Sequence, residues 1–246
     1  MHPELFEIGA FQLKTYGVFI ALAFFIGYYL VYSEAKRKNF YPEKILDLEL
    51  CVLISGIIGA RILHVAVNLD YYRNHLLEIP MLWRGGLAIY GGLIFGIVAS
   101  WVFMVKSKIP LRQTADLIIP YIALGQAIGR MGCFLNGCCY GRHTIPVLGV
   151  CFPGETVSRF PTQILASLAL LAIFVILKLA QKKSPYSGFV FTLYLVLYSQ
   201  QRFFIDFLRG DTPRYAFEFT VSQFISIGIF VIGVLLFVFG RKAWKN

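Results

Sequence analysis

Residues 221–240 read VSQFISIGIFVIGVLLFVFG and contain no charged side chain. An apolar run of about 20 residues is long enough to cross a bilayer as one α-helix. The chain is 58% hydrophobic and only 15% charged, whereas soluble domains average about 25% charged residues. We therefore predict an all-α polytopic membrane protein with seven transmembrane helices, at Tyr16–Ser33, Ile45–Leu69, Gly86–Val105, Thr114–Ile128, Pro161–Ala180, Gly188–Phe207 and Val221–Gly240.

Basic residues give the orientation, because cytoplasmic loops are enriched in Lys and Arg. One alternate set of connections holds twelve Lys and Arg in tight runs, and the other set holds eight. The richer set includes the residues after 240, so we expect an N-out/C-in topology. The net charge of +10 would suggest nucleic acid in a soluble protein, but here it follows from these loops, and we expect no nucleic-acid partner.

The organisation predicted is one integral membrane domain, 1–246, with outer-side segments 70–84, 130–160 and 208–220. Residues 1–13 lack a basic stretch followed by a short apolar core and a small-residue cleavage site, so we expect no cleaved signal peptide. The fourth span is the shortest and carries Asp116 and Pro120.

Polar side chains gather near the outer ends of the predicted spans, and ionisable groups inside a bilayer are usually paired or functional. Arg202, Asp206 and Arg209 share one helix face, which by itself fits an ion-paired stripe. Guanidinium groups outnumber carboxylates at this depth, and Arg forms bidentate bonds to phosphate oxygens. The pattern predicts a site for a phospholipid head group, and its further members are Tyr16, Arg61, His64, Tyr90 and Arg130.

Two segments are rich in glycine. Residues 83–96 read WRGGLAIYGGLIFG, and residues 125–142 read GQAIGRMGCFLNGCCYGR. Glycines in the first segment indicate either close helix packing or backbone that lines a cavity. In the second, glycines beside Arg130 and Asn136 predict irregular backbone at membrane depth, where free N–H groups bind an anion.

Cysteines 133, 138 and 139 lie within the second glycine-rich segment, and Cys151 follows it. The alternatives are a disulfide on the oxidising side, a metal site, a catalytic thiol or small packing residues. The spacing lacks the second cysteine pair of common zinc sites, so we expect no metal and no cofactor. The redox state of these cysteines stays open.

With these motifs in view, the sequence resembles the bacterial prolipoprotein diacylglyceryl transferases over nearly its whole length. The family signature, roughly G-R-x-G-N-F-x-N-G-E-x-x-G, matches residues 129–141, GRMGCFLNGCCYG. Similar stretches elsewhere are Tyr16-Gly17, Gly59-Ala60-Arg61, Trp83 through Gly92, Arg159 through Gln163, and Arg202 through Arg209.

Four positions depart from the family pattern. Tyr90 stands where the family has His, Cys133 where it has Asn, and Cys138 and Asp206 where it has Glu. The family assigns a general-base role to that His, and tyrosine, with a reference pKa of about 10, is a poor base at neutral pH. Either the base lies elsewhere, or the thiol ionises in a cationic site, or the chain belongs to a divergent Cys-containing subfamily.

The resemblance implies transfer of the diacylglyceryl group of phosphatidylglycerol to the lipobox cysteine of a preprolipoprotein signal peptide, with release of glycerol phosphate. It places the protein in the bacterial cytoplasmic (inner) membrane, as a multi-pass protein in contact with membrane lipid. The expected catalytic residues are Arg130, Arg202, Tyr90 and Asp206, and the expected substrate-binding residues are Tyr16, Arg61, Gly132, Asn136 and Arg209. Two alternatives are a related lipid-modifying transferase with another donor or acceptor, and an anionic-solute transporter.

Overall fold

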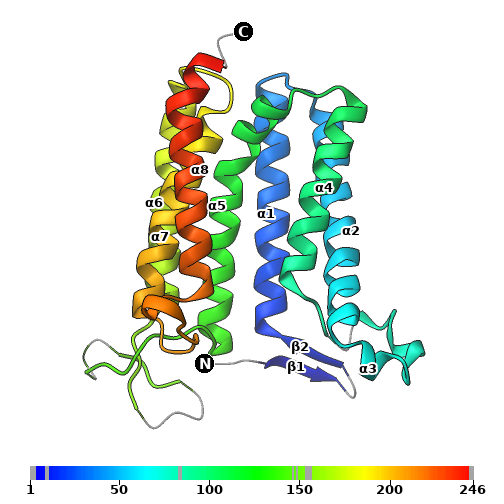
Figure 1. Ribbon diagram of the computed structural model, residues 1–246. Coiled ribbons are helices and arrows are strands. Elements are labelled where there is room, and N and C mark those ends of the chain that lie inside the picture. Colours follow the sequence, from blue (N-terminus) through cyan, green and yellow to red (C-terminus); the bar gives the residue numbers. More distant parts are fainter. Residues whose placement is uncertain are drawn as a thin grey trace. The chain divides into compact units, whose positions relative to one another are not determined.

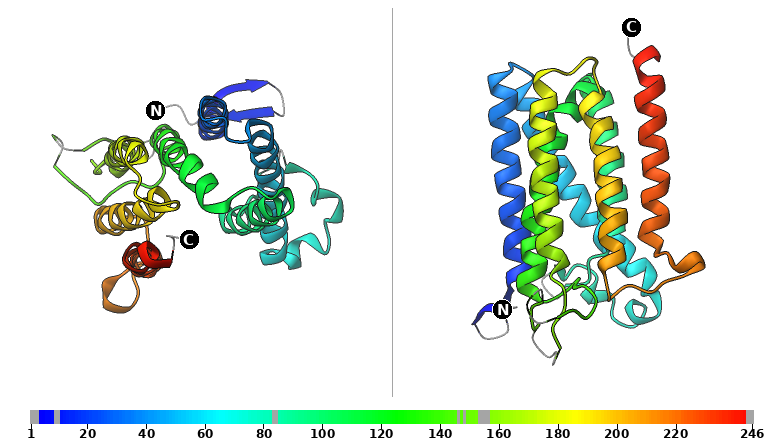
Figure 2. Two further views of the ribbon diagram at one scale, coloured as in Figure 1. Left: turned by 90° about the horizontal axis from the view of Figure 1, so that it is seen from above. Right: turned by 90° about the vertical axis from the view of Figure 1, so that its left-hand side faces the viewer.

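A computed structural model of the protein describes residues 4–8, 11–82, 85–145, 147, 149–152 and 157–243 (Figures 1 and 2). Trp83 and Arg84 lie outside the described residues, as do Pro146, Leu148, residues 153–156 and both chain ends. The elements in chain order are the strands β1 (Glu4–Ile8) and β2 (Phe11–Lys14), and the helices α1 (Thr15–Arg37), α2 (Pro42–Val67), α3 (Leu69–Tyr72), α4 (Ile89–Ser107), α5 (Leu111–Asn136), α6 (Thr162–Lys182), α7 (Phe189–Leu208) and α8 (Val221–Ala243).

The prediction of a helical membrane protein is confirmed. Six helices in the described part of the chain are long and apolar enough to span a membrane, namely α1, α2, α4, α5, α6 and α8. Many of their large apolar side chains face outward, such as Phe25 with 68% and Ile89 with 74% of its surface exposed. Outward apolar side chains suit helices that face lipid. An antiparallel hairpin of β1 and β2 precedes α1, and the all-α prediction did not include it.

One predicted span was wrong in extent. The fourth span was expected to end at Ile128, with irregular backbone beyond it, yet α5 stays helical to Asn136. The glycines of this stretch serve close helix packing instead. A Cβ atom on Gly132 would lie 2.7 Å from Cβ of Phe19 in α1, which is closer than real Cβ atoms approach.

Residues 1–31 and 115–246 form one compact unit, which holds the first part of α1, most of α5, and α6 to α8. Helix α7 packs against α6 and α8, which run alongside it in both figures. The buried core of this unit brings together side chains from α5, α6 and α7: Ile119, Ala123, Ile173, Leu177, Val190 and Tyr194.

Polar contacts also join the helices of this unit. Asp116, in the short predicted span, accepts backbone hydrogen bonds from Gly188 at 2.6 Å and from Phe191 at 2.8 Å. The carboxylate therefore caps the N-terminus of α7 from a neighbouring helix, where free N–H groups favour negative charge.

Residues 32–114 form the second compact unit, which contains the whole of α2, α3 and α4. Here the first glycine-rich segment packs helix against helix. A Cβ on Gly59 of α2 would lie 2.7 Å from the carbonyl oxygen of Gly91 in α4, and one on Gly92 would lie 3.1 Å from that of Gly56. Glycine at these positions lets the two backbones touch, as in other membrane helix pairs.

Candidate functional site

The C-terminal end of α7 carries a network around a fully buried carboxylate. Oδ1 of Asp206 lies 3.1 Å from Nη1 of Arg202 and 3.9 Å from Nη1 of Arg209. Its Oδ2 accepts hydrogen bonds from the hydroxyls of Thr220, at 2.7 Å, and of Ser222. Because a buried charge is tolerated only when it is paired and hydrogen-bonded, this carboxylate fixes both guanidinium groups and the start of α8 relative to α7.

The two arginines of this network each have a second partner. Nη2 of Arg202 donates to Ser222 at 3.1 Å. Arg209 forms a bidentate pair with Asp211, at 2.9 Å from Nε and 2.8 Å from Nη2. Burial alone would lower the pKa of Arg209, but the hydrogen bonds and charge of Asp211 raise the pKa above its ordinary value. Arg209 therefore stays cationic.

Arg130, near the end of α5, differs from these two arginines. Its side chain is half-buried, and within the described ranges it has neither a carboxylate partner nor a hydrogen bond. It lies within electrostatic range of Arg202, Cys139 and the Tyr16 hydroxyl. A guanidinium held near like charges without a carboxylate favours the binding of an anion.

Tyr16 reaches this group because α1 and α5 approach closely. Gly132 faces α1, and a Cβ there would lie 3.6 Å from Cδ2 of Tyr16 as well as meeting Phe19. Tyr16 is 37% exposed. Gly132 thus contributes by its lack of a side chain, which leaves room for Phe19, three residues after Tyr16 on α1.

The loop after α5 turns sharply back on the helix end. Gly137 has φ +73° and Cys139 has φ +63°, so both residues adopt the left-handed conformation. Buried side chains at the start of α6 fix this loop, since Thr162 donates to the carbonyl of Cys139 and Gln163 to that of Cys138, both at 2.7 Å. Two residues further on, the backbone N–H of Gly141 donates a hydrogen bond to the carbonyl of Phe160 at 2.8 Å.

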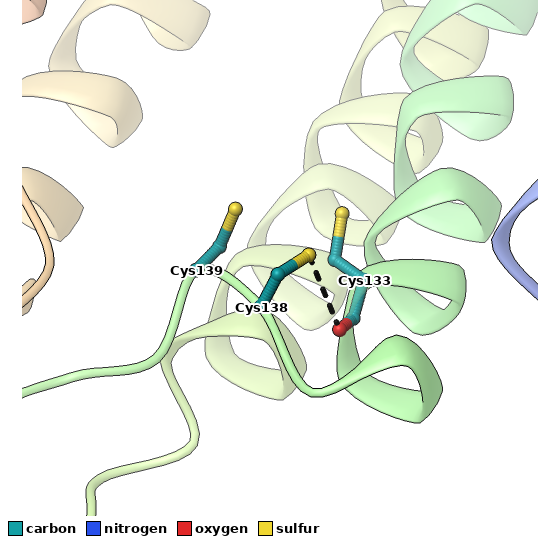
Figure 3. Close-up of side chains that lie close together, drawn as sticks. All are labelled: Cys133, Cys138 and Cys139. Carbon is teal, nitrogen blue, oxygen red and sulfur yellow. Dashed lines mark hydrogen bonds between the residues drawn. The ribbon is translucent and has the colours of Figure 1, made fainter. Parts of the chain in front are cut away.

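This turn brings three thiols together (Figure 3). The Sγ atoms of Cys133, Cys138 and Cys139 all lie within 4.8 Å of one another, and all three cysteines are free. Hydrogen bonds from the thiols of Cys133 and Cys138, together with the charges of Arg209 and Arg130, lower the pKa of Cys139. Asn136 interacts with the Cys138 thiol from the last residue of α5.

Arg61 lies in the other unit, residues 32–114, where its guanidinium group donates hydrogen bonds to backbone carbonyls. Its side chain is buried, with Nε 2.7 Å from the carbonyl oxygen of Ile79 and Nη1 2.7 Å from that of Gly85. The remaining carbonyl partners are Glu78, Met81 and Gly86. Arg61 therefore organises the loop before α4, and head-group binding by this residue stays a prediction.

Tyr90 is the second residue of α4 and is 59% exposed. His64 and Arg61 line a hollow of about 400 Å³ in the same unit, together with Tyr71, Tyr72, Glu78, Gly85 and Gly86. Tyr90 is not part of its lining.

The structure places seven of the predicted site residues in one unit, and Arg61 and Tyr90 in the other. These seven residues are Tyr16, Arg130, Gly132, Asn136, Arg202, Asp206 and Arg209.

Sequence reasoning missed the residues that hold the site in place. Thr220, Ser222 and Gln223 open an otherwise apolar span, and Gln223 donates to the carbonyl of Phe203 at 3.3 Å. Polar residues at the start of an apolar run were the available signal. Asp211 gave no comparable signal in composition or spacing, and Thr162 and Gln163 were named only as part of the family-like stretch Arg159 through Gln163.

The fold and this site define an integral membrane protein with a cationic, thiol-containing site at one end of a helical bundle. The family model described as prolipoprotein diacylglyceryl transferase matches residues 3–239, and the chain belongs to this family. It is similar to the phosphatidylglycerol–prolipoprotein diacylglyceryl transferase of Clostridium tetani, with 32% identity over 98% of each chain. Relatives with the same name are found in Finegoldia magna, at 36% identity over 98% of this chain and 97% of the relative, and in Staphylococcus saprophyticus, at 34% identity over 97% and 89%.

Proposed function

We propose that the protein transfers the diacylglyceryl group of phosphatidylglycerol to the lipobox cysteine of preprolipoproteins and releases glycerol phosphate. The observation that carries the proposal is Arg130, a half-buried guanidinium with no carboxylate partner among the described residues, within electrostatic range of Arg202, which does have one. Family membership supplies the reaction class. The two substrates, a phospholipid and a signal peptide, suit a protein with membrane-spanning helices.

In the reaction, a C–O bond to the phosphate of the lipid breaks while a C–S bond to the acceptor cysteine forms. Arg130 and Arg202 bind the phosphate and stabilise the charge that develops on it as it leaves. Asp206 acts as a positioning residue, because it contacts both Arg202 and Arg209 and holds their guanidinium groups toward the lipid. Tyr16 and Asn136 complete the contacts to the head group.

The experiment is a membrane assay with phosphatidylglycerol and a lipobox peptide. Removal of one positioned donor to a developing charge slows an enzyme by about 100- to 1,000-fold, so Arg130→Ala is expected to lose activity on this scale. Arg73→Ala is the matched control, because Arg73 is a 72%-exposed arginine in the other unit. Full turnover by both Arg130→Ala and Arg202→Ala would remove these residues from the reaction.

We infer a seven-span, N-out/C-in arrangement in the bacterial cytoplasmic membrane. Helix α7 is not among the six apolar spans, but at 20 residues it matches their length and packs between α6 and α8. Its lower hydropathy follows from the site residues Arg202 and Asp206. The twelve-to-eight distribution of basic residues gives the orientation. A fluorescent protein fused after Asn246 should fold and emit in the cytoplasm, and an alkaline phosphatase fused there should be inactive.

A related transferase with a different donor or acceptor is the second candidate, because Tyr90, Cys133 and Cys138 depart from the family pattern. Exchange of phosphatidylglycerol for other phospholipids, and complementation of a strain depleted of its transferase, separate the two. Transport of an anionic solute is disfavoured because the charges lie at helix ends rather than at the bilayer midplane. Flux into proteoliposomes tests it.

A further inference from the structure

The three thiols of Cys133, Cys138 and Cys139 form a built site rather than a chance cluster. Cys133 comes from the last turns of α5, and the other two come from the loop that follows (Figure 3). The backbone N–H of Cys138 donates to the carbonyl of Cys133 at 3.1 Å, and the Cys138 thiol contacts the same carbonyl at 3.7 Å. Gly137 and Cys139 adopt the left-handed conformation, and hydrogen bonds from the buried side chains of Thr162 and Gln163 hold the loop in this turn.

The distances suit a metal ion with soft-ligand preference. Zinc binds thiolates at about 2.3 Å, so three sulfurs around a tetrahedral zinc lie about 3.8 Å apart. The Sγ atoms here all lie within 4.8 Å of one another, which is close to that separation. We propose that Cys133, Cys138 and Cys139 bind one zinc ion, whose fourth position receives the thiolate of the acceptor cysteine.

Neither disulfide formation nor simple packing accounts for the arrangement as well. Three thiols cannot all pair with one another, and the exposed Cys151 interacts with Ser158, with its Sγ 3.7 Å from that hydroxyl. Small packing residues would be expected in apolar surroundings, whereas the Cys139 thiol lies within electrostatic range of Arg209 and Arg130.

The charges also balance around a metal. Three thiolates and one Zn²⁺ carry a net charge of about −1, and a fourth thiolate would make the net charge more negative, about −2. Arg130 and Arg209 lie within electrostatic range of Cys139 and offset that charge. The spacing of the cysteines in the sequence argued against zinc, but the turn after Asn136 supplies the third ligand at close range.

The second part of the inference rests on the proposed transfer reaction, and the first part does not. A zinc site with three protein ligands keeps one position open, as catalytic zinc sites do. A thiol that coordinates the metal is deprotonated outright, and its proton leaves to water. The acceptor sulfur held at this position would attack the glyceryl carbon, so that a C–S bond forms while the C–O bond to the phosphate breaks. Glycerol phosphate would leave with the electron pair of that C–O bond, held by Arg130 and Arg202, and the neutral thioether product would be released. No group is oxidised or reduced in this step.

The test uses the full-length protein in phosphatidylglycerol nanodiscs under reducing conditions. We expect about one zinc per chain by elemental analysis and, after exchange with Co²⁺, a sulfur-to-cobalt charge-transfer band. Cys133→Ser, Cys138→Ser and Cys139→Ser should each weaken zinc binding by more than about 100-fold, because loss of an outer-shell partner alone costs 10- to 100-fold. Cys151→Ser, outside the cluster, should bind zinc as the wild type does.

Each of the following results tests one part of the inference. Wild-type protein that carries no zinc and shows no charge-transfer band with Co²⁺ would overturn the metal site, as would a disulfide within the cluster in protein alkylated without reductant. Transfer that continues at full rate after zinc is removed by a chelator would overturn the role at the acceptor thiol. Stoichiometric zinc without transfer from phosphatidylglycerol to a lipobox peptide would instead refute the proposed function and leave the metal site standing.

Discussion

Replacement of Asp206 by asparagine should destabilise the protein and slow the transfer reaction together. Asp206 is 0% exposed and faces Arg202 at 3.1 Å and Arg209 at 3.9 Å. Removal of one partner from a buried ion pair costs about 3–5 kcal/mol. The cost here is smaller, about 2–3 kcal/mol, because Arg202 is 16% exposed, Arg209 keeps Asp211, and the amide oxygen still accepts hydrogen bonds.

The assay is thermal unfolding in detergent, together with turnover. In a chain of this size 1 kcal/mol shifts Tm by about 2–4 °C, so Asp206→Asn should lower Tm by about 4–12 °C. Asp70→Asn makes the same chemical change at a fully exposed carboxylate, whose partner Arg73 is also exposed, and should shift Tm by less than about 2 °C. Equal Tm values for the two variants would refute the reasoning.

A merely structural role for Asp206 is separated from a positioning role by a third variant. Asp206→Glu keeps the charge, and glutamate occupies this position in the family pattern. We expect Asp206→Glu to recover most of the turnover lost in Asp206→Asn, because Arg202 again has a partner that orients it. Turnover in Asp206→Asn that stays normal at a temperature well below its Tm would show that the carboxylate only stabilises the fold.

Three further predictions concern packing, capping and loop order. Gly132→Ala should destabilise the protein by about 1–3 kcal/mol, because its Cβ would meet Phe19 at 2.7 Å, and thermal unfolding measures this. Asp116→Ala should cost about 0.5–2 kcal/mol in the same assay, since α7 loses the acceptor for two N–H groups. Arg61→Gln should leave the carbonyls of the loop before α4 without donors, and hydrogen exchange at residues 78–86 should rise.

Each of these changes has a matched control. Gly17→Ala places a methyl group in open space and is expected to leave Tm unchanged or raise it slightly, because alanine favours helix over glycine. Asp47→Ala removes an exposed carboxylate from α2 and should change stability by less than about 0.5 kcal/mol. Arg73→Gln should not change exchange at residues 78–86. A control that behaves like its partner variant would contradict the corresponding argument.

The glycine-rich segments show where local pattern stopped being informative. Glycine is compatible with both a tight helix contact and an irregular loop, so composition left both readings open. For Gly59 and Gly91 the packing reading holds, and for residues 125–136 the predicted irregular backbone was wrong because α5 continues to Asn136. The partner helix decides between the two readings, and it is distant in sequence.

The sequence by itself determined the membrane-spanning helices, since hydropathy is a property of about 20 consecutive residues and needs no partner. It also determined the family, through motifs that can be read in order. Only the tertiary structure decided which groups meet, because the contact between Asp206 and Ser222 joins two helices, and the one between Thr162 and the carbonyl of Cys139 joins a helix to a distant loop. The thiol cluster is of this kind, because its third sulfur is brought into range by a left-handed turn that α6 holds in place.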